Sequence, residues 1–366
     1  MTRDAPKILF LFALLLAPLF AGCSTAGYYW QAAGGQMELW WKRRDIEAVV
    51  GDPTTDAGLR ARLQQVQAAR AFAMTELHLP DNGSYRHYAD LGRPYAVWNV
   101  FATPEFSLTP REWCFPVAGC VGYRGYFAEA DARAEAEALR REGYEVYVAP
   151  VAAYSTLGWF RDPVLNTLLR RSDVEVAALL FHELAHQLLY VAGDSAFNES
   201  FASAVEAEGR RRWAENLGDA RGYTEFRAAE RRRGGFAELV GEARAQLAAL
   251  FQSSATDPEH MRHEKQRIRA QLRARYQQLR DGSWGGRGDY EAWFSQDLNN
   301  AQLASVGLYH VHVASFEQLL RREGGNMQAF YAAARALAGQ PREERERALR
   351  ALAAEAENKT AALRRP

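Results

Sequence analysis

The sequence is poor in cysteine and has no excess of either charge. Only three of its 366 residues are cysteines, and 45 lysines and arginines balance 45 aspartates and glutamates. Proteins that bind DNA or RNA through the phosphates usually carry a basic excess, so this balance excludes nucleic acid as the expected partner. The long apolar run at residues 8–20 is too short for a stable transmembrane helix. The rest of the composition is that of a folded, soluble body.

The N-terminus has the features of a lipoprotein signal peptide. Two basic residues precede the apolar run, which ends in Ala-Gly-Cys23. In this interpretation residues 1–22 are removed and Cys23 becomes the lipidated N-terminus, anchored stably by several acyl chains. Ser24 follows instead of Asp, which in a Gram-negative cell predicts an outer-membrane lipoprotein facing the periplasm. The alternative is an uncleaved N-terminal anchor.

The two remaining cysteines, Cys114 and Cys120, have five residues between them. The periplasm is oxidising, and this spacing is close enough for a disulfide that closes a short loop. We therefore predict a Cys114–Cys120 disulfide. The alternative is a pair of free thiols.

One predicted helix contains the residues that indicate a chemical function. Residues 174–190 lack Pro and Gly and are rich in Ala and Leu, and residues four apart share one face of a helix. His182 and His186 therefore project side by side and can bind one divalent ion. Glu183 follows the first histidine and reaches the water that the metal polarises. This HExxH pattern is typical of metal-dependent peptidases.

A catalytic zinc needs three protein ligands and one open position, so a third ligand must be found. A metzincin would have Gly and His where this chain has Leu189 and Ala192, which excludes that class. In gluzincins the third ligand is a Glu on a second helix, and residues 193–195 supply the stop, turn and N-cap before one. Glu199 in the first turn of that helix and Glu206 two turns later are the candidates.

Two segments resemble the aminopeptidase N family of gluzincins. Residues 182–187 read HELAHQ, and residues 198–206 read NESFASAVE where the family has NEGFASYVE. The resemblance implies that Glu199 is the third zinc ligand, and it leaves Glu206 to support a ligand or pack the helix. The spacing between His186 and Glu199 is shorter than in that family, so the connecting loop must turn more tightly. The family's GAMEN motif, which binds the substrate amine, has no match.

The chain as a whole is similar to a bacterial family described as putative aminopeptidases. The similarity lies in residues 154–160, in Asp162-Pro163, in the segment 114–120 with its two cysteines, and in the lipoprotein leader. Because the name of that family comes from its zinc motif, this resemblance adds a name and no further chemistry.

The patterns of apolar residues predict a mainly α fold with a small β-sheet, an α+β arrangement. We expect a zincin-like metallopeptidase core with a helical hairpin inserted into it. The predicted regions are the leader at 1–22, a helical region at 23–92, and the sheet with the zinc-binding helices at 93–220. A charged helical hairpin follows at 221–282, and a helical region at 283–366 completes the site. Charges of both signs alternate along the hairpin, which predicts a solvated face.

Three further assignments leave alternatives open. Residues 151–160 are either an edge strand that hydrogen-bonds an extended substrate or a buried strand. The family uses a downstream Tyr to bind the oxyanion, and Tyr309 is the candidate here, beside His310 and His312. The three residues are at least as well explained as packing groups. Surface exposure is the expectation for His260 and His263.

The predicted function is a zinc peptidase acting on peptide or protein substrates, with aminopeptidase activity favoured. Zn²⁺ held by His182, His186 and Glu199 would activate water, with Glu183 as the general base. One alternative is a zinc endopeptidase for quality control of envelope proteins. Another is an envelope lipoprotein without catalytic activity in which zinc holds two helices together. The sequence does not determine the oligomeric state.

Overall fold

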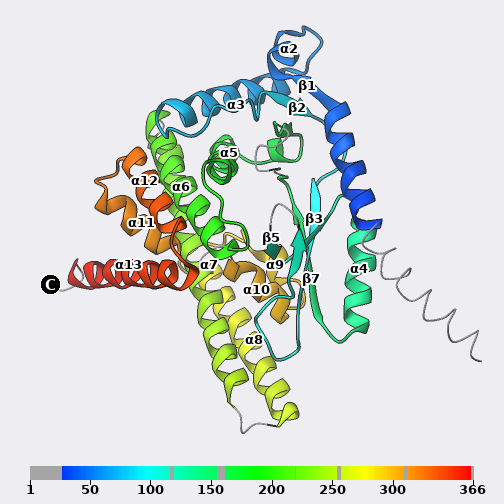
Figure 1. Cartoon of the computed structure of the whole chain (residues 1–366), viewed down its shortest axis with the longest axis vertical. Coiled ribbons are helices and arrows are strands. Elements are labelled where there is room, and N and C mark those ends of the chain that lie inside the picture. The colour runs from blue at the N-terminus through cyan, green and yellow to red at the C-terminus, as the bar shows by residue number, and fades with distance from the viewer. Residues whose placement is uncertain are drawn as a thin grey trace, which may run out of the picture.

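The computed structural model describes residues 27–115, 119–154, 156, 161–218, 220–253, 257–308 and 312–363 (Figure 1). These residues form a mainly helical fold with three small sheets, as the sequence predicted for the class. Within these ranges no helix combines the length and the apolar character that crossing a bilayer requires.

Short strands are concentrated in the first half of the chain. The elements there are a helix at residues 27–42, β1 (Arg43–Asp45), α2 (Ile46–Gly51), α3 (Ala57–Thr75), β2 (His87–Ala89), β3 (Val97–Thr103), β4 (Trp113–Phe115), β5 (Gly119–Val121), β6 (Arg124–Tyr126), α4 (Glu129–Arg141), β7 (Glu145–Val151) and β8 (Val164–Leu165). The second half is helical. It contains η1 (Leu168–Arg170), α5 (Asp173–Leu188), α6 (Ser195–Asn216), α7 (Ala220–Gln252), α8 (Pro258–Asp281), α9 (Glu291–Phe294), α10 (Asn300–Leu308), α11 (Val313–Arg322), α12 (Met327–Ala338) and α13 (Arg342–Leu363).

β3 is the central strand of the sheet β6-β3-β7 and pairs antiparallel with both neighbours. Successive side chains of a strand point to opposite faces of the sheet. Trp98, Val100 and Ala102 of β3 accordingly pack with residues of α4 in one apolar cluster. Phe101 points to the other face, where its ring lies 5.5 Å from that of Tyr123. A second sheet, β1-β2-β8, and the hairpin β4-β5 complete the β structure.

Two of the expected strands differ from those observed. The aromatic and β-branched residues 121–127 are divided between β5 and β6, which belong to different sheets. β5 pairs with β4 and β6 pairs with β3, so the chain turns at Gly122-Tyr123. The strand expected at residues 151–160 ends at Val151. Residues 152–154 and 156 are not in a strand, and 155 and 157–160 lie outside the described residues.

The largest apolar core joins α3, α5 and α6 with the C-terminal helices α11 to α13. Its centre is aromatic: the Phe201 ring lies 5.7 Å from Phe316 and 5.8 Å from Phe330, and all three are fully buried. Burying one such ring contributes roughly 1.5–3 kcal/mol to stability. This core therefore fixes one side of the helix pair α5–α6.

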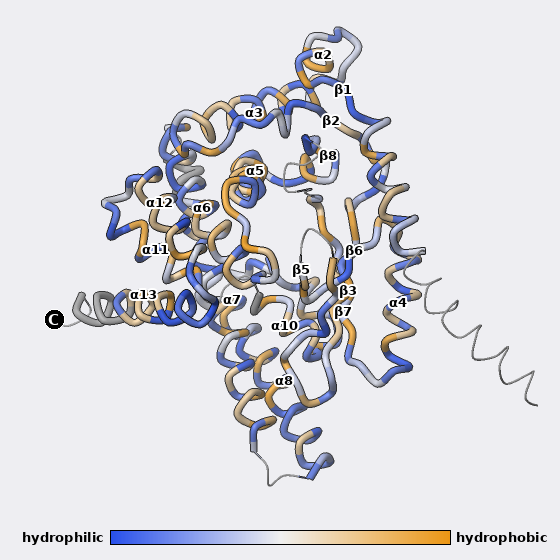
Figure 2. The backbone as a smooth tube through the Cα atoms, in the orientation of Figure 1, coloured by the Kyte–Doolittle hydropathy of each residue, from blue (hydrophilic) through white to orange (hydrophobic). Residues whose placement is uncertain are grey.

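α7 and α8 pack against each other and extend away from the largest core (Figure 1). They have an apolar cluster of their own, closed at one end by aromatic residues that include Trp284 and Phe294. Hydrophilic and hydrophobic residues alternate along both helices (Figure 2). About half of their charged residues are exposed.

Candidate metal centre

α5 is defined at its start by a capping box. The Glu175 backbone N–H donates to Ser172 Oγ, and Glu175 Oε2 accepts from the Ser172 backbone N–H at 2.9 Å. Such a box satisfies two helix N–H groups that would otherwise lack partners. The apolar face of α5, with Phe181 and Leu184, enters the largest core. This packing sets the rotation of the helix.

His182 and His186 are both 8% exposed on α5. Their ring centroids are 4.8 Å apart, as the spacing of four residues on a helix predicts. His182 Nε2 and His186 Nε2 face each other at 3.1 Å. Two imidazole lone pairs at this distance repel each other unless a proton or a cation lies between them. This geometry is the first indication of a cation site.

The loop between α5 and α6 is held by Asn198. The side-chain Oδ1 of Asn198 accepts from the Val191 N–H at 2.7 Å, and its Nδ2 donates to the Val191 carbonyl at 2.8 Å. Gly193 takes a positive φ of 78°, which favours glycine. The sequence required a tight turn here, and these two residues produce it. The residue before Glu199 thus fixes the position at which the second helix begins.

The start of α6 is tied to the end of the chain. Asp194 is its N-cap and accepts from the Phe197 N–H at 3.1 Å. Its other oxygen, Oδ2, accepts from Arg345 Nη2 of α13 at 2.6 Å and from Nε at 3.0 Å. Both side chains of this ion pair are buried. Removing one member of such a pair is expected to destabilise the fold by about 3–5 kcal/mol.

Glu199 of α6 completes a group of three donors. Its Oε2 lies 3.4 Å from His182 Nε2 and 3.7 Å from His186 Nε2. Donors that bind one tetrahedral zinc at about 2.0–2.1 Å lie roughly 3.3 Å from one another. The three observed separations bracket that value, so His182, His186 and Glu199 fit a single metal ion without rearrangement.

Glu206 lies behind His182 and does not join this group. Its Oε2 is 3.1 Å from His182 Nδ1, so the ring N–H at Nδ1 donates to the carboxylate and leaves the Nε2 lone pair for a metal. The other oxygen of Glu206 accepts from Arg210 on α6 and from Arg233 of α7 at 2.8 Å. Arg210 also donates to Glu230 of α7 at 2.7 Å. Glu206 therefore orients His182 and connects it to α7.

The electrostatics of the centre favour positive charge. Burial opposes a charge on His182, yet hydrogen bonds to Glu199 and Glu206 hold its pKa well above the ordinary value. Burial likewise raises the pKa of Glu199, but His186 and His182 outweigh it, so the pKa lies well below its usual range. Two ionised carboxylates on either side of His182 provide the surroundings that a divalent cation requires.

Glu183 lies beside the ligands and is half-buried. Burial raises the pKa of its carboxyl above the ordinary value, although His182 and His186 act in the opposite direction. A carboxylate with a raised pKa can take a proton from water and release it again to an amine. The HExxH pattern predicts this role for Glu183.

Two tyrosines at this centre were not predicted from the sequence. Tyr190 follows His186 by four residues, and the two ring centroids are 6.5 Å apart. Burial raises the pKa of the Tyr190 hydroxyl, and the charge of Glu199 raises it further. Tyr123, between β5 and β6, has a raised pKa from burial and then from Glu199, Tyr190 and Glu183. The spacing of four residues could have indicated Tyr190, but no sequence signal connects Tyr123 to the zinc motif.

Three of the predicted residues lie outside the part of the chain that the structure describes, namely Cys23, Tyr309 and His310. The backbone N–H of His312 donates to Ser200 Oγ of α6 at 3.1 Å, and burial lowers the pKa of its imidazole. His260 and His263 are exposed on α8. In the part of the chain that the structure describes, neither joins a group of three metal-binding side chains.

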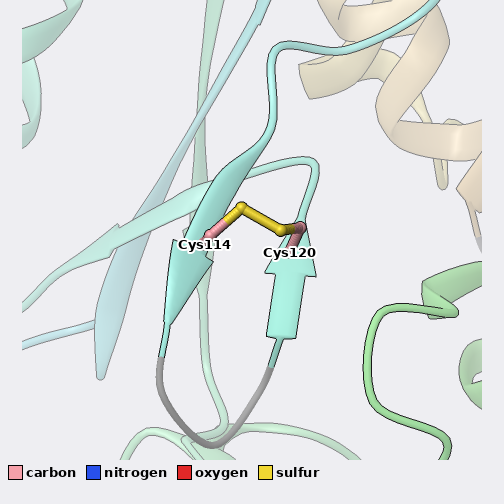
Figure 3. The surroundings of a disulfide bond; sticks show 2 residues. All are labelled: Cys114 and Cys120. Carbon is pink, nitrogen blue, oxygen red and sulfur yellow. A yellow bond between two sulfur atoms is a disulfide. The ribbon is translucent and has the colours of Figure 1, made fainter.

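Cys114 of β4 and Cys120 of β5 form a disulfide across their hairpin (Figure 3). The hairpin contacts the loop that joins α5 and α6. A Cβ atom on Gly119 would lie only 2.6 Å from the Gly193 backbone nitrogen, so only glycine fits there. Gly119 also has a positive φ of 74°. The disulfide-closed hairpin therefore supports the tight turn before α6.

Comparison with known proteins gives one finding about the family. No protein of curated function and no solved structure matches the chain. A family model described as "Putative aminopeptidase" matches residues 27–349, which include the whole metal centre and nearly all of the described fold. The chain therefore belongs to this putative aminopeptidase family.

Proposed function

We propose that the protein is a zinc-dependent aminopeptidase in which His182, His186 and Glu199 hold the ion. The observation that supports this most directly is the convergence of one donor atom from each of these residues at separations of 3.1–3.7 Å. When bound, zinc would supply a Lewis acid that makes water acidic and polarises a peptide carbonyl. Two His and one Glu form the ligand set of several zinc peptidases and leave a position open.

The proton transfers fall to Glu183. It accepts a proton from the water that attacks the peptide carbonyl, and it then gives that proton to the departing amine. The raised pKa from burial suits this double role. Hydrogen-bond donors must also stabilise the negative oxygen of the tetrahedral intermediate. We keep Tyr309 as a candidate for this role and add Tyr190 and Tyr123, because Glu199 lies in the surroundings of both hydroxyls.

Membership of the family supports a substrate with a free amino terminus. The substrate class can be tested directly. An aminopeptidase should release the reporter from aminoacyl derivatives, whereas the competing endopeptidase hypothesis predicts cleavage of internally quenched peptides with blocked ends. We further propose that the enzyme is a lipoprotein, anchored through Cys23 to the outer membrane and facing the periplasm.

Glu183→Gln tests the mechanism. Because glutamine cannot take the proton but keeps the shape of the side chain, we expect turnover to fall by about 10²–10⁴-fold. The metal content, measured by elemental analysis, should stay near that of the unaltered protein. The control is Glu215→Gln, which removes an exposed carboxylate from α6.

Two results would contradict this proposal. Undiminished turnover in the Glu183→Gln variant would exclude Glu183 as the base. A chain that binds zinc stoichiometrically, loses stability on chelation and cleaves neither class of substrate would favour a structural ion instead.

A further inference from the structure

The helix at residues 27–42 exposes large apolar side chains. Seven such side chains are exposed among the described residues, and five of them belong to this one helix. Trp30 is 83% exposed and Trp41 82%, and Tyr29, Met37 and Trp40 are between 44% and 47% exposed. Single exposed apolar residues are ordinary, but a concentration of this kind marks an interaction surface.

The most exposed of these side chains form a stripe. Trp30, Met37 and Trp41 are spaced seven and four residues apart, which places them within about 40° of one another around a helix. We use the name aromatic stripe for the surface formed by Trp30, Met37 and Trp41, together with the exposed Gly34 between Trp30 and Met37. A stripe this narrow presents its side chains in a single direction.

The opposite face of the helix is fixed to the folded body. Leu39 is 1% exposed and joins Leu91 and Ala96 in an apolar cluster. A Cβ atom on Gly35 would lie 2.1 Å from the Phe127 ring, so the helix backbone packs directly on that ring. Gln31 Oε1 accepts from the Phe127 N–H at 3.0 Å. These contacts prevent the helix from turning the stripe inward.

Basic residues follow the stripe immediately. Lys42, Arg43 and Arg44 end the helix and begin β1, and Lys42 and Arg44 are exposed. The Arg43 guanidinium lies 5.8 Å from the centre of the Trp40 ring. Tryptophans with adjacent Lys and Arg are typical of segments at a bilayer surface, where the indoles enter the boundary region and the cations meet anionic head groups.

The position of the predicted lipid anchor brings a bilayer to this helix. Cys23 precedes Gly27 by four residues, and a fully extended chain of that length spans at most about 14 Å. Acyl chains on Cys23 would lie in the bilayer, so the start of the helix would lie within about 14 Å of the head groups. The stripe is therefore held close to lipid, which favours lipid over a protein partner as its occupant.

We propose that the helix at residues 27–42 lies on a phospholipid bilayer, with the aromatic stripe inserted at the boundary between head groups and acyl chains. The helix is packed rigidly on the body, so it sets the orientation of the whole protein on the membrane. The acyl anchor alone would leave the protein free to swivel. This proposal depends on the lipid anchor at Cys23 and not on the zinc chemistry.

The test uses the acylated protein, processed in cells and reconstituted into vesicles of phosphatidylethanolamine and phosphatidylglycerol. Vesicles whose acyl chains carry bromine quench the fluorescence of tryptophans that enter the bilayer. We expect measurable quenching in the unaltered protein. In the variant Trp30→Ser/Trp41→Ser the quenched fraction of the tryptophan fluorescence should be at least twofold smaller. The control is Leu217→Ser, which removes an exposed apolar side chain elsewhere and should leave the quenching unchanged.

Other outcomes would overturn the proposal. Equal quenching in the double variant and the unaltered protein would mean that the stripe does not enter the bilayer. Absence of quenching in both would mean that something other than lipid covers the stripe. If the mass of the N-terminal peptide shows no acylation, the protein has no lipid anchor at Cys23 and the proposal fails. Zinc content, measured on the same samples, should not change in the double variant, so this result is independent of the proposed catalysis.

Discussion

α5–α6 and α7–α8 are both pairs of consecutive packed helices, but they use charge in opposite ways. The ionisable residues of α5–α6 that point inward are few, and most of them meet at the metal centre. α7 and α8 carry many charges, about half of them exposed, and some of these pair along the surface. Charge that enters an apolar core is costly and must be matched by partners, whereas surface ion pairs contribute little. The inward-pointing charges of α5–α6 therefore serve the candidate site, whereas the exposed charges of α7–α8 mainly keep the hairpin soluble.

The helical hairpin contains exceptions to this separation, among them Arg233 and Lys265. Arg233 of α7 reaches Glu206 at the metal centre. Lys265 of α8 is 3% exposed and donates to Glu145 of β7 at 2.6 Å. Burial lowers the pKa of Lys265, and Glu145 acts in the opposite direction. The predicted solvated face does not include Lys265, because alternating charges do not reveal which of them meets a neighbouring sheet.

The largest expected effect comes from removing a ligand. Glu199→Ala should weaken zinc binding roughly 10³-fold, about 4 kcal/mol, which is one third of the ~10–16 kcal/mol typical of structural zinc sites. Competition with a chelator of known affinity measures it. Glu215→Ala, at the exposed end of the same helix, should bind zinc normally. Full zinc affinity in the Glu199 variant would show that the third ligand has been misassigned.

A smaller loss of zinc affinity should follow from a change at Glu206, which lies behind His182. Glu206→Gln keeps the shape of the side chain but removes the negative charge that orients the ring, so we expect zinc affinity to fall by about 10- to 100-fold. The same chelator titration applies, with thermal unfolding as a check on the fold. A loss as large as that of Glu199→Ala would indicate that Glu206 itself binds the metal.

Lys265→Met tests the buried charge on α8. The variant leaves Glu145 with Arg269 and the backbone N–H of Asn300 as partners, so we expect the free energy of unfolding to fall by about 1.5 kcal/mol, less than for a buried pair left with no partner. Denaturant titration measures it. Arg267→Met on the outside of α8 should change stability by less than about 0.5 kcal/mol. Equal losses of stability in both variants would show that the buried Lys265 contributes no more than an exposed charge of α8.

The smallest effect is expected where the hairpin reaches the metal centre. Arg233→Met removes one of two guanidinium partners of Glu206, and Arg210 remains. A partly exposed pair contributes roughly 0.2–1 kcal/mol, so zinc affinity should fall two- to threefold. Arg231→Met, an exposed residue of the same turn, is the control. An unchanged affinity would mean that α7 does not influence the metal centre.

The local parts of the site could be predicted from the sequence. The spacing of His182 and His186 gives one helical face, and the similarity of the segment around Glu199 indicated a residue whose carboxylate lies 3.4 Å from His182 Nε2. The mainly helical fold with small sheets also followed from the apolar spacing. These features depend on residues close together in the chain, where helical geometry is sufficient.

The contacts between distant parts of the chain could not be predicted. Tyr123 comes to the centre because β5 and β6 belong to different sheets, and β6 pairs with β3, which precedes the whole β4-β5 hairpin in the chain. The contact of Arg233 with Glu206 depends on how α7 packs against α6. The double hydrogen bond of Asn198 to Val191 likewise appears only once the loop is folded.

The ion pair between Asp194 and Arg345 has a consequence for the order in which the protein matures. One partner begins the helix that carries Glu199, and the other lies 151 residues later in the chain. A chain is made, and in the proposed lipoprotein also exported, from its N-terminus onward. Helix α6 therefore gains this fastening only after the chain as far as Arg345 has followed it and folded against it. A shortened chain that ends before Arg345 keeps every predicted ligand in its sequence, yet it should be poor at holding them in place.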